Sequence, residues 1–159
     1  MKTICVTGAV GTGKTEVSKK LARHLKFDYL DVTKLIKKEK ISCGYDKENK
    51  CDIIDTKELN KILIKKIKES EGLIIDSHMS HYLPKRVVDL CIVTKCDIEV
   101  LNKRLKKRRY LKAKIKSNLE AEIFDVCLLE VKKKKHNVLV IDTSKGIKIR
   151  EIINYIKNA

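Results

Sequence analysis

The stretch Gly8-Ala9-Val10-Gly11-Thr12-Gly13-Lys14-Thr15 decides the fold of this chain. It follows the apolar run Ile4-Cys5-Val6 and precedes a helical pattern with Val17, Leu21 and Leu25 on one face. Strand, glycine loop and helix in this order are the context of a phosphate-binding loop. Its backbone N–H groups surround the β- and γ-phosphates of a nucleotide at a helix N-terminus. A glycine-rich turn with no ligand is the alternative, and the complete spacing argues against it.

Two side chains at the end of this stretch carry its chemistry. Lys14 is expected to reach the β- and γ-phosphate oxygens, and the Thr15 hydroxyl is expected to ligate Mg²⁺. The predicted ligand is therefore a nucleoside triphosphate with Mg²⁺. The glycines that let the loop approach the phosphates are Gly8, Gly11 and Gly13.

Strands and helices are predicted to alternate along the rest of the chain. Apolar runs without alternation predict buried strands at 4–6, 27–31, 72–76, 87–93 and 138–142. Five helices are predicted after the first one. One is a brief piece around 35–36, one begins at a capping box at 55–58, and one begins at Asp97. The last two extend over 112–135 and 145–156. Residues 37–55 are polar and are predicted to be irregular. The fold class is therefore α/β, with a parallel sheet covered on both faces.

Length and composition place limits on the class of protein. The 159 residues predict a single domain over 1–159, and 43% apolar content is enough for a core. The sequence shows neither a signal peptide nor a membrane span, so a cytoplasmic protein is expected. The six cysteines form no C-x-x-C pair, which favours buried free thiols over a zinc site.

The net charge of +16 favours a polyanionic partner, but only six of the 37 basic residues are arginine. A lysine-rich composition or thermal adaptation gives the same count, so charge alone leaves nucleic-acid contact open. Between 100 and 117 there are nine basic residues and no acidic one. This stretch is either a solvated helix face or a mobile lid that brings arginines to the transferring phosphoryl group.

A carboxylate at the end of a buried strand is the second part of a phosphate-loop site, because it holds Mg²⁺ opposite Thr15. Asp76 and Asp142 both end such strands. We prefer Asp76, since the loop after it can fold over the nucleotide. His78, two residues later, is either a surface residue or the group that orients an attacking water or hydroxyl.

Thr94-Lys95-Cys96-Asp97 is similar to the guanine-reading signature of small GTPases. Such enzymes also need an Asp-x-x-Gly after a strand, and that pattern is absent from the sequence. We therefore interpret Asp97 as the N-cap of a helix.

Several further motifs resemble one family. They are Gly44-Tyr45-Asp46, Cys51-Asp52-Ile53-Ile54-Asp55, Ile75-Asp76-Ser77-His78, Tyr82-Leu83-Pro84, Arg108-Arg109-Tyr110, and Asn118 followed by Glu122-Ile123-Phe124. Together with the phosphate loop they resemble the adenylate kinase isoenzyme 6 family of archaea and eukaryotes, over nearly the whole chain.

The resemblance implies an adenylate-kinase fold of P-loop type, with a five-stranded parallel sheet, a monophosphate-binding region at 31–54 and a short lid at 104–114. It implies nucleoside monophosphate kinase and ATPase activities with ATP and Mg²⁺. It further implies transient binding of a platform ribosomal protein during late maturation of the small ribosomal subunit and its rRNA, with release on ATP hydrolysis.

Position by position, the resemblance places Gly11, Gly13, Lys14, Thr15 and Glu16 at the triphosphate. Arg108 becomes the lid arginine, and Asp76 with His78 becomes the Asp-x-His motif. The catalytic residues are then Lys14, Asp76, His78 and Arg108, and the metal ligands are Thr15 and Asp76.

Three positions depart from the family pattern. Arg109 replaces a glycine after the lid arginine, Glu120 replaces a glutamine, and Lys34 replaces an acidic residue. No arginine occurs between Arg23 and Arg86, although planar arginine forks usually clamp a monophosphate. The predicted monophosphate-binding residues are therefore Asp31, Lys37 (with Lys38 as a second point charge) and Arg86.

Two other functions remain open. One is a small-molecule kinase that acts on a metabolite, which the scarcity of arginine in the acceptor region allows. The other is an RNA- or ribosome-binding factor with a nucleotide switch and negligible turnover, which the basic residues at 100–117 and 132–135 suggest. Lid closure over ATP could also bias partner binding.

Overall fold

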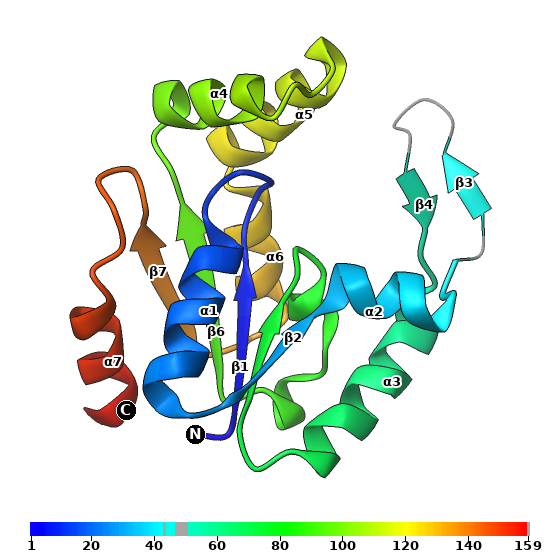
Figure 1. Ribbon diagram of the computed structural model, residues 1–159, viewed down its shortest axis with the longest axis vertical. Helices are drawn as coiled ribbons and strands as arrows, with labels where there is room; N and C mark the ends of the chain where they lie inside the picture. The colour runs from blue at the N-terminus through cyan, green and yellow to red at the C-terminus, as the bar shows by residue number, and fades with distance from the viewer. Residues whose placement is uncertain (43, 47–50, 159) are drawn as a thin grey trace.

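The computed structural model describes residues 1–42, 44–46 and 51–158 (Figure 1). Its centre is a five-stranded parallel sheet in the order β2-β5-β1-β6-β7. The strands are β1 (Thr3–Thr7), β2 (Asp28–Asp31), β5 (Leu73–Asp76), β6 (Leu90–Lys95) and β7 (Val138–Asp142). The predicted α/β class and the five parallel strands are confirmed. The phosphate loop follows β1, the middle strand, so its neighbours on both sides end beside it.

Alternate residues of the three central strands point to opposite faces of the sheet and are buried on both. On one face Ile4, Ile74 and Ile92 pack against α1 (Lys14–Leu25) and α7 (Ile149–Asn158). On the other face Cys5 and Cys91 meet residues of the helices described next.

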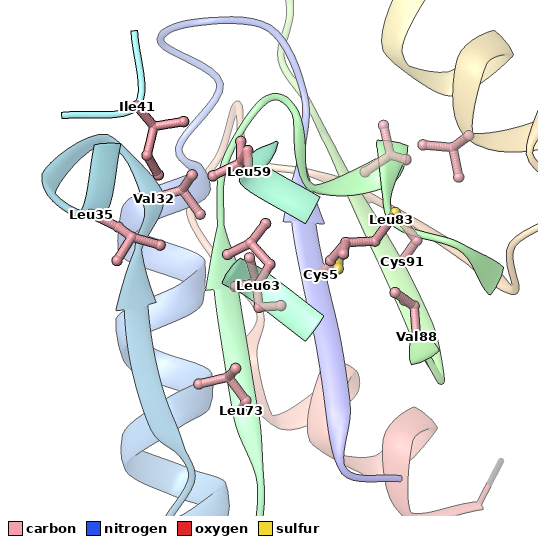
Figure 2. Packing of buried hydrophobic residues seen from close by; sticks show 13 residues of the cluster. Cys5, Val32, Leu35, Ile41, Leu59, Leu63, Leu73, Leu83, Val88 and Cys91 are labelled. Atoms are coloured by element: carbon pink, nitrogen blue, oxygen red, sulfur yellow. The ribbon is translucent and has the colours of Figure 1, made fainter. Parts of the chain in front are cut away.

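The second face of the sheet is covered by α2 (Val32–Glu39), α3 (Thr56–Glu69) and α6 (Val126–Lys133). Figure 2 shows Leu59 and Leu63 of α3 pointing to the strands beside Val32 and Leu35 of α2. Burying one leucine side chain stabilises the fold by about 1.5–3 kcal/mol.

Two helices lie beyond the carboxyl ends of the strands. They are α4 (Ile98–Lys107) and α5 (Lys112–Ile123), which pack against each other above the phosphate loop (Figure 1). The short antiparallel strands β3 (Gly44–Asp46) and β4 (Cys51–Ile53) project from the body of the molecule (Figure 1). Two 3₁₀ turns, η1 (Ser80–Tyr82) and η2 (Lys85–Val87), fill the connection between β5 and β6.

The predicted helix starts are confirmed where an aspartate caps them. Asp55 accepts hydrogen bonds from the N–H groups of Lys57 and Glu58, and Asp97 accepts them from Glu99 and Val100. The helical piece predicted around 35–36 is α2.

Three predicted boundaries were wrong. The long helix over 112–135 is two helices, because the backbone turns at Asp125, whose φ is 54°. The strand predicted at 87–93 begins at Leu90, since Asp89 Oδ2 instead accepts the N–H groups of Lys2 and Thr3. The last helix begins at Ile149 rather than at residue 145.

Residues 37–55, predicted to be irregular, contain the end of α2 and the paired strands β3 and β4. Residues 43 and 47–50 of this segment lie outside the described part of the chain. Within that described part, no helix is both long enough and apolar enough to cross a membrane.

Four of the six cysteines can be compared with the prediction of buried free thiols. Cys5, Cys91 and Cys96 are buried and free, and Cys127 is free and half-buried. Burial raises the pKa of the Cys91 thiol to about 12. Cys43 and the side chain of Cys51 lie outside the description.

Candidate active site

The phosphate loop takes a conformation that requires glycine. Gly8 and Gly13 have φ values of 139° and 93°, in the region that side-chain-bearing residues rarely adopt. A Cβ atom on Gly8 would also lie 2.5 Å from the backbone oxygen of Thr94. The loop therefore sits directly against the end of β6, with Gly13 as the N-cap of α1.

Buried threonines of the loop itself and of the ends of β6 and β7 hold this loop in place. Thr12 Oγ1 donates to the carbonyl of Ala9 (2.8 Å) and lies 2.6 Å from Thr94 Oγ1. Thr143 Oγ1, just after β7, donates to the carbonyl of Thr12 (2.7 Å). In the sequence, Thr94 was noted only as part of the rejected GTPase-like motif. In the structure its hydroxyl contacts Thr12 and so supports the loop. Thr143 carries no motif and was missed.

Lys14 bonds to its own loop in this structure. Its Nζ donates to the carbonyls of Gly8 (2.9 Å) and Ala9 (2.8 Å). Burial lowers the pKa of the Lys14 ammonium, and the nearby Asp76 carboxylate opposes that shift. Phosphate oxygens are charged acceptors and bind an ammonium more strongly than neutral carbonyls do. A bound polyphosphate would therefore draw Nζ away from the loop.

A cavity of about 950 Å³ opens over the phosphate loop at the carboxyl ends of the strands, and we call it the main cavity. Most of the predicted site residues line it, namely Gly11, Gly13, Lys14, Thr15, Glu16, Asp31, Asp76, His78 and Arg108. Gly8, the first glycine of the loop, does not line this cavity. Ligands of parallel α/β sheets generally bind at this edge.

Asp76 and Thr15 both line the main cavity and carry oxygen atoms that can bind a cation. The Tyr29 hydroxyl donates to Asp76 Oδ2 (2.9 Å), which fixes the carboxylate. Burial raises the pKa of Tyr29, and its bond to Asp76 adds to the shift. Mg²⁺ in triphosphate sites usually takes one or two protein oxygens and completes its shell with phosphate and water.

The donor set therefore fits Mg²⁺ held against a triphosphate. In the described ranges, no group of three or more His, Cys, Asp or Glu side chains forms a metal site by itself. Tyr29 was not predicted, because a tyrosine in a short strand has no motif of its own.

His78 stands at the border of the main cavity and is exposed. Partial burial against the cleft and the charge of Lys14 lower the pKa of its imidazole, and Lys114 contributes in the same direction. The neutral ring is therefore favoured at pH 7, and a neutral imidazole can accept a proton.

Basic side chains from α4 and the following turn border the main cavity on the side of the expected lid. Arg104 donates to both the carbonyl (2.8 Å) and the hydroxyl (3.1 Å) of Thr143, and more weakly to the carbonyl of Gly11 (3.4 Å). Arg108, the C-cap of α4, also lines the cavity. Arg109 does not line it, and its φ of 56° lies in the region that favours glycine.

The helix α5 is attached to the phosphate loop by Asn118. Its Oδ1 accepts from the N–H of Val10 (3.2 Å), and its Nδ2 donates to the carbonyl of Lys114 (2.8 Å). Lys114 lines the main cavity and lies 4.6 Å from the centre of the Tyr110 ring. Asn118 was noted in the sequence only as a family residue, and its contact with Val10 was not predicted.

A second cavity of about 520 Å³ adjoins the main one, and the two share Val10 and His78. Its polar lining comes from Thr56, Tyr82, Asn118, Cys127 and Glu130. Lys37 and Arg86, two of the three predicted monophosphate residues, are exposed and line neither cavity. The structure therefore does not bring them together with Asp31.

Comparison with known proteins agrees with this geometry. The family described as AAA domain matches residues 4–125. Over 155 residues the chain is 35% identical to "Putative adenylate kinase" of Methanocaldococcus jannaschii, covering 98% of this chain and 86% of that protein. Over 143 residues it is 33% identical to "Adenylate kinase isoenzyme 6 homolog" of Dictyostelium discoideum, covering 87% of this chain and 79% of that protein.

Solved structures with the same fold include shikimate kinase from Acinetobacter baumannii, with a TM-score of 0.68 at 16% identity over 99% of this chain and 94% of that one. Deoxyadenosine kinase from M. mycoides has a TM-score of 0.62 at 13% identity, over 99% of this chain and all of that one. At such identities the likeness concerns the fold alone. The sequence matches extend over nearly the whole chain, and on that ground the chain belongs to the adenylate kinase isoenzyme 6 family.

Proposed function

We propose that the protein is a Mg·ATP-dependent nucleoside monophosphate kinase that also hydrolyses ATP, with AMP or another nucleoside monophosphate as acceptor. The observation that carries the proposal is that Lys14, Thr15, Asp76, His78 and Arg108 border one cavity over a formed phosphate loop. Membership of a family of adenylate kinases supports phosphoryl transfer as the reaction.

Each of these residues then has a role that its position allows. Lys14 and the loop N–H groups hold the β- and γ-phosphates, and Arg108 offsets charge on the three equatorial oxygens of the transferred group. His78, neutral at pH 7, orients the attacking water or acceptor oxygen. Thr15 and Asp76 would hold Mg²⁺, which when bound neutralises charge on the β- and γ-phosphates.

The acceptor is expected at the border between the two cavities, beside His78. We propose residues 31–54 as the monophosphate-binding region and 104–114 as the lid of a single domain over 1–159. Asp31 already lines the main cavity. Lys37 contacts an acceptor phosphate in this proposal only if the region moves towards the loop, as nucleotide kinases commonly do on closure. Arg86 lies outside the region, in η2, and would need a separate movement.

A second candidate, a metabolite kinase, is favoured by the lining of the second cavity. That lining contains the carboxylate of Glu130 and neither lysine nor arginine. Glu130 Oε2 is 2.9 Å from His81 Nε2, and Tyr82 donates to Oε1 (3.2 Å), so the carboxylate is held in place. An acceptor rich in hydroxyl or amino groups fits this lining better than a phosphate does.

We also propose that the protein acts in the cytoplasm in late maturation of the small ribosomal subunit and its rRNA. Its partner would be a ribosomal protein of the platform, bound transiently beside the pre-ribosomal RNA. The family resemblance suggests this role, and the net charge of +16 agrees with a site rich in RNA phosphate. In the remaining alternative, the nucleotide only switches RNA binding and turnover is negligible.

A coupled assay separates these functions. Purified protein with Mg·ATP is given each nucleoside monophosphate in turn, then a panel of hydroxylated metabolites, and ADP and phosphate release are both measured. ADP formation that depends on AMP or another monophosphate supports the main proposal, and dependence on a metabolite supports the second candidate. Absence of both phosphoryl transfer and hydrolysis would leave only the nucleotide-switched binding factor.

The proposed ribosomal role has its own test, because it does not depend on which acceptor is used. Cosedimentation with immature small subunits is compared in the presence of ADP and of a non-hydrolysable ATP analogue. Binding that changes with the nucleotide supports the role, and the absence of binding in both states rejects it.

A further inference from the structure

Four large apolar side chains are exposed at the junction of α5 and α6, and Val126, at 39%, is the least exposed of them. Ile123 is 56% exposed, Phe124 is 67% exposed and Leu129 is 58% exposed. We call these three residues the junction patch. They come from a segment of seven residues that spans the break between the two helices. Phe124 is one of only two phenylalanines in the chain, and a cluster of exposed large apolar residues commonly marks an interaction site.

The fold itself holds these side chains outward. Glu122 and Asp125, on either side of Ile123 and Phe124, are both bonded to Lys95 at the end of β6. Glu122 is buried, and its Oε1 also accepts the N–H of Cys96 (2.8 Å). Because the flanking residues are fixed to the sheet, Ile123 and Phe124 cannot turn into the core without breaking these bonds.

The charge around the junction patch is positive. Glu120 is paired with Lys116, while Glu122 and Asp125 share the single cation Lys95. Burial lowers the pKa of the His81 imidazole, so its contact with Glu130 does not neutralise that carboxylate. Four further lysines outweigh the negative charge that remains. Lys132 to Lys135 begin three positions after Leu129, beyond Glu130 and Val131, and are all exposed. The patch is therefore an apolar surface with a lysine rim at its C-terminal side.

We propose that the junction patch is a docking surface for a protein segment whose apolar side chains are flanked by aspartate or glutamate. Aromatic and aliphatic anchors supply the contact area of such interfaces, and opposite charges at the rim set the choice of partner. This surface lies outside the main cavity, so the proposal does not depend on which acceptor the enzyme uses.

Two other occupants fit the patch less well. A symmetric contact with a second copy would bring two identical lysine rims together, and like charges repel. Single-stranded RNA would use the lysines, but its bases stack on aromatic rings, and two of the three patch residues are aliphatic.

The test uses two fluorescent helical peptides of equal length, each with leucines on one face and either glutamates or lysines on the other. Their affinity for the full chain is measured by fluorescence anisotropy. We expect the glutamate peptide to bind and the lysine peptide not to bind. Phe124→Ser combined with Leu129→Ser should weaken binding at least tenfold, a loss typical of anchor residues.

Two further variants distinguish binding at the junction patch from non-specific hydrophobic binding. Tyr155→Ser removes an apolar side chain on α7 that is 43% exposed and should leave affinity unchanged. Lys132→Gln with Lys133→Gln should weaken binding mainly at low salt, as rim charges do. ATP hydrolysis, measured in parallel, should stay at the wild-type rate in all variants and shows that each is folded.

Several results would overturn the proposal. They are failure of the glutamate peptide to bind, equal binding of both peptides, and equal weakening by Tyr155→Ser. Self-association in sedimentation that the patch variant abolishes would make a second copy the occupant. Binding of an RNA oligonucleotide that is lost in the patch variant, without peptide binding, would make RNA the occupant.

Discussion

Lys14 is the residue whose substitution tests the nucleotide site most directly. Its Nζ is held by two carbonyls of its own loop, and the phosphate-loop motif assigns this lysine to the β- and γ-phosphates. We expect Lys14→Ala to lower ATP hydrolysis about 10²–10³-fold, as loss of one well-placed electrostatic contact does. Phosphate release at saturating Mg·ATP measures this. Lys68→Ala, an exposed change on α3, is the control, and equal rates in the two variants would contradict the role of Lys14.

His78 should give the reaction a characteristic pH dependence. Burial and Lys14 lower the pKa of its imidazole, so the ring stays neutral until the pH falls below its usual value of about 6.5. If the neutral ring orients the attacking group, hydrolysis should decline only on the acidic side of that value. His78→Gln should bind ATP normally, hydrolyse it more slowly, and lose this acidic decline.

The control for His78 is His24→Gln, because His24 is exposed on α1 and its ring bonds to the carbonyl of Lys20. Its pH profile should match that of the wild type. An unchanged hydrolysis rate in His78→Gln at pH 7 would rule out the proposed role of His78.

Arg109 lies in a backbone conformation that suits glycine. Its φ is 56°, a region that costs a residue with a side chain roughly 1–2 kcal/mol. Arg109→Gly removes that strain but adds freedom to the unfolded chain, so we expect a net gain of about 0.5–1 kcal/mol in the free energy of unfolding. Urea denaturation measures it. Lys103→Gly, an exposed change inside α4, should instead destabilise by up to about 1 kcal/mol, and a loss at both positions would refute the strain argument.

At the scale of elements, one lysine joins the α5–α6 junction to the sheet. Lys95 Nζ pairs with Glu122 (3.1 Å) and Asp125 and donates to the carbonyl of Glu122 (2.9 Å). Lys95→Met should lower the free energy of unfolding by roughly 2–3 kcal/mol, because it leaves the buried Glu122 carboxylate without its cation. The loss should not be larger, since water partly screens Lys95.

Lys116→Met is the matched control for Lys95, since its pair with Glu120 lies at the surface and should contribute less than about 0.5 kcal/mol. Lys95→Arg should keep most of the stability. Equal losses for Lys95→Met and Lys116→Met, measured by urea denaturation, would show that the junction does not depend on this contact.

The elements that the sequence predicted well are those with local signals. The strands beside the phosphate loop are continuous apolar runs, and aspartate caps mark the starts of α3 and α4. The break between α5 and α6 could not be predicted, because Asp125 is bonded to Lys95, which lies 30 positions earlier, and such a contact leaves no local pattern. The pairing of β3 with β4 was missed for a related reason, since two polar three-residue strands carry no clear period.

For the molecule as a whole, the site residues that could be predicted are those that a local sequence pattern marks. Lys14 and Thr15 follow from the glycine loop, and Asp76 follows from its place at a strand end. Tyr29 and Thr143 come from other strands and meet the site only because the sheet places them there. A contact between distant segments leaves no local pattern, so such supporting residues appear only in the folded chain.

Removing Mg²⁺ tests the site at this scale. The loop, the end of β5 and α4 all border the main cavity, so bound Mg·ATP should stabilise the entire fold. At about 100 times the dissociation constant the gain is about 2.7 kcal/mol, seen as a higher melting temperature. EDTA should abolish turnover and reduce this gain. A melting temperature that ATP does not change, with or without Mg²⁺, would contradict the proposed site.

The hydrogen bonds of the threonines that hold the phosphate loop affect how the free energy of nucleotide binding is used. The free energy is divided between ordering the loop and moving other elements. Thr12, Thr94 and Thr143 hold the phosphate loop in one conformation before ATP binds. The loop therefore loses little conformational entropy on binding. Most of the favourable contact energy is then free to drive rearrangement in outlying parts, such as α5 and the β3–β4 arm. Calorimetry on Thr94→Val, which loosens this foundation, should show a larger entropic penalty for the same ligand.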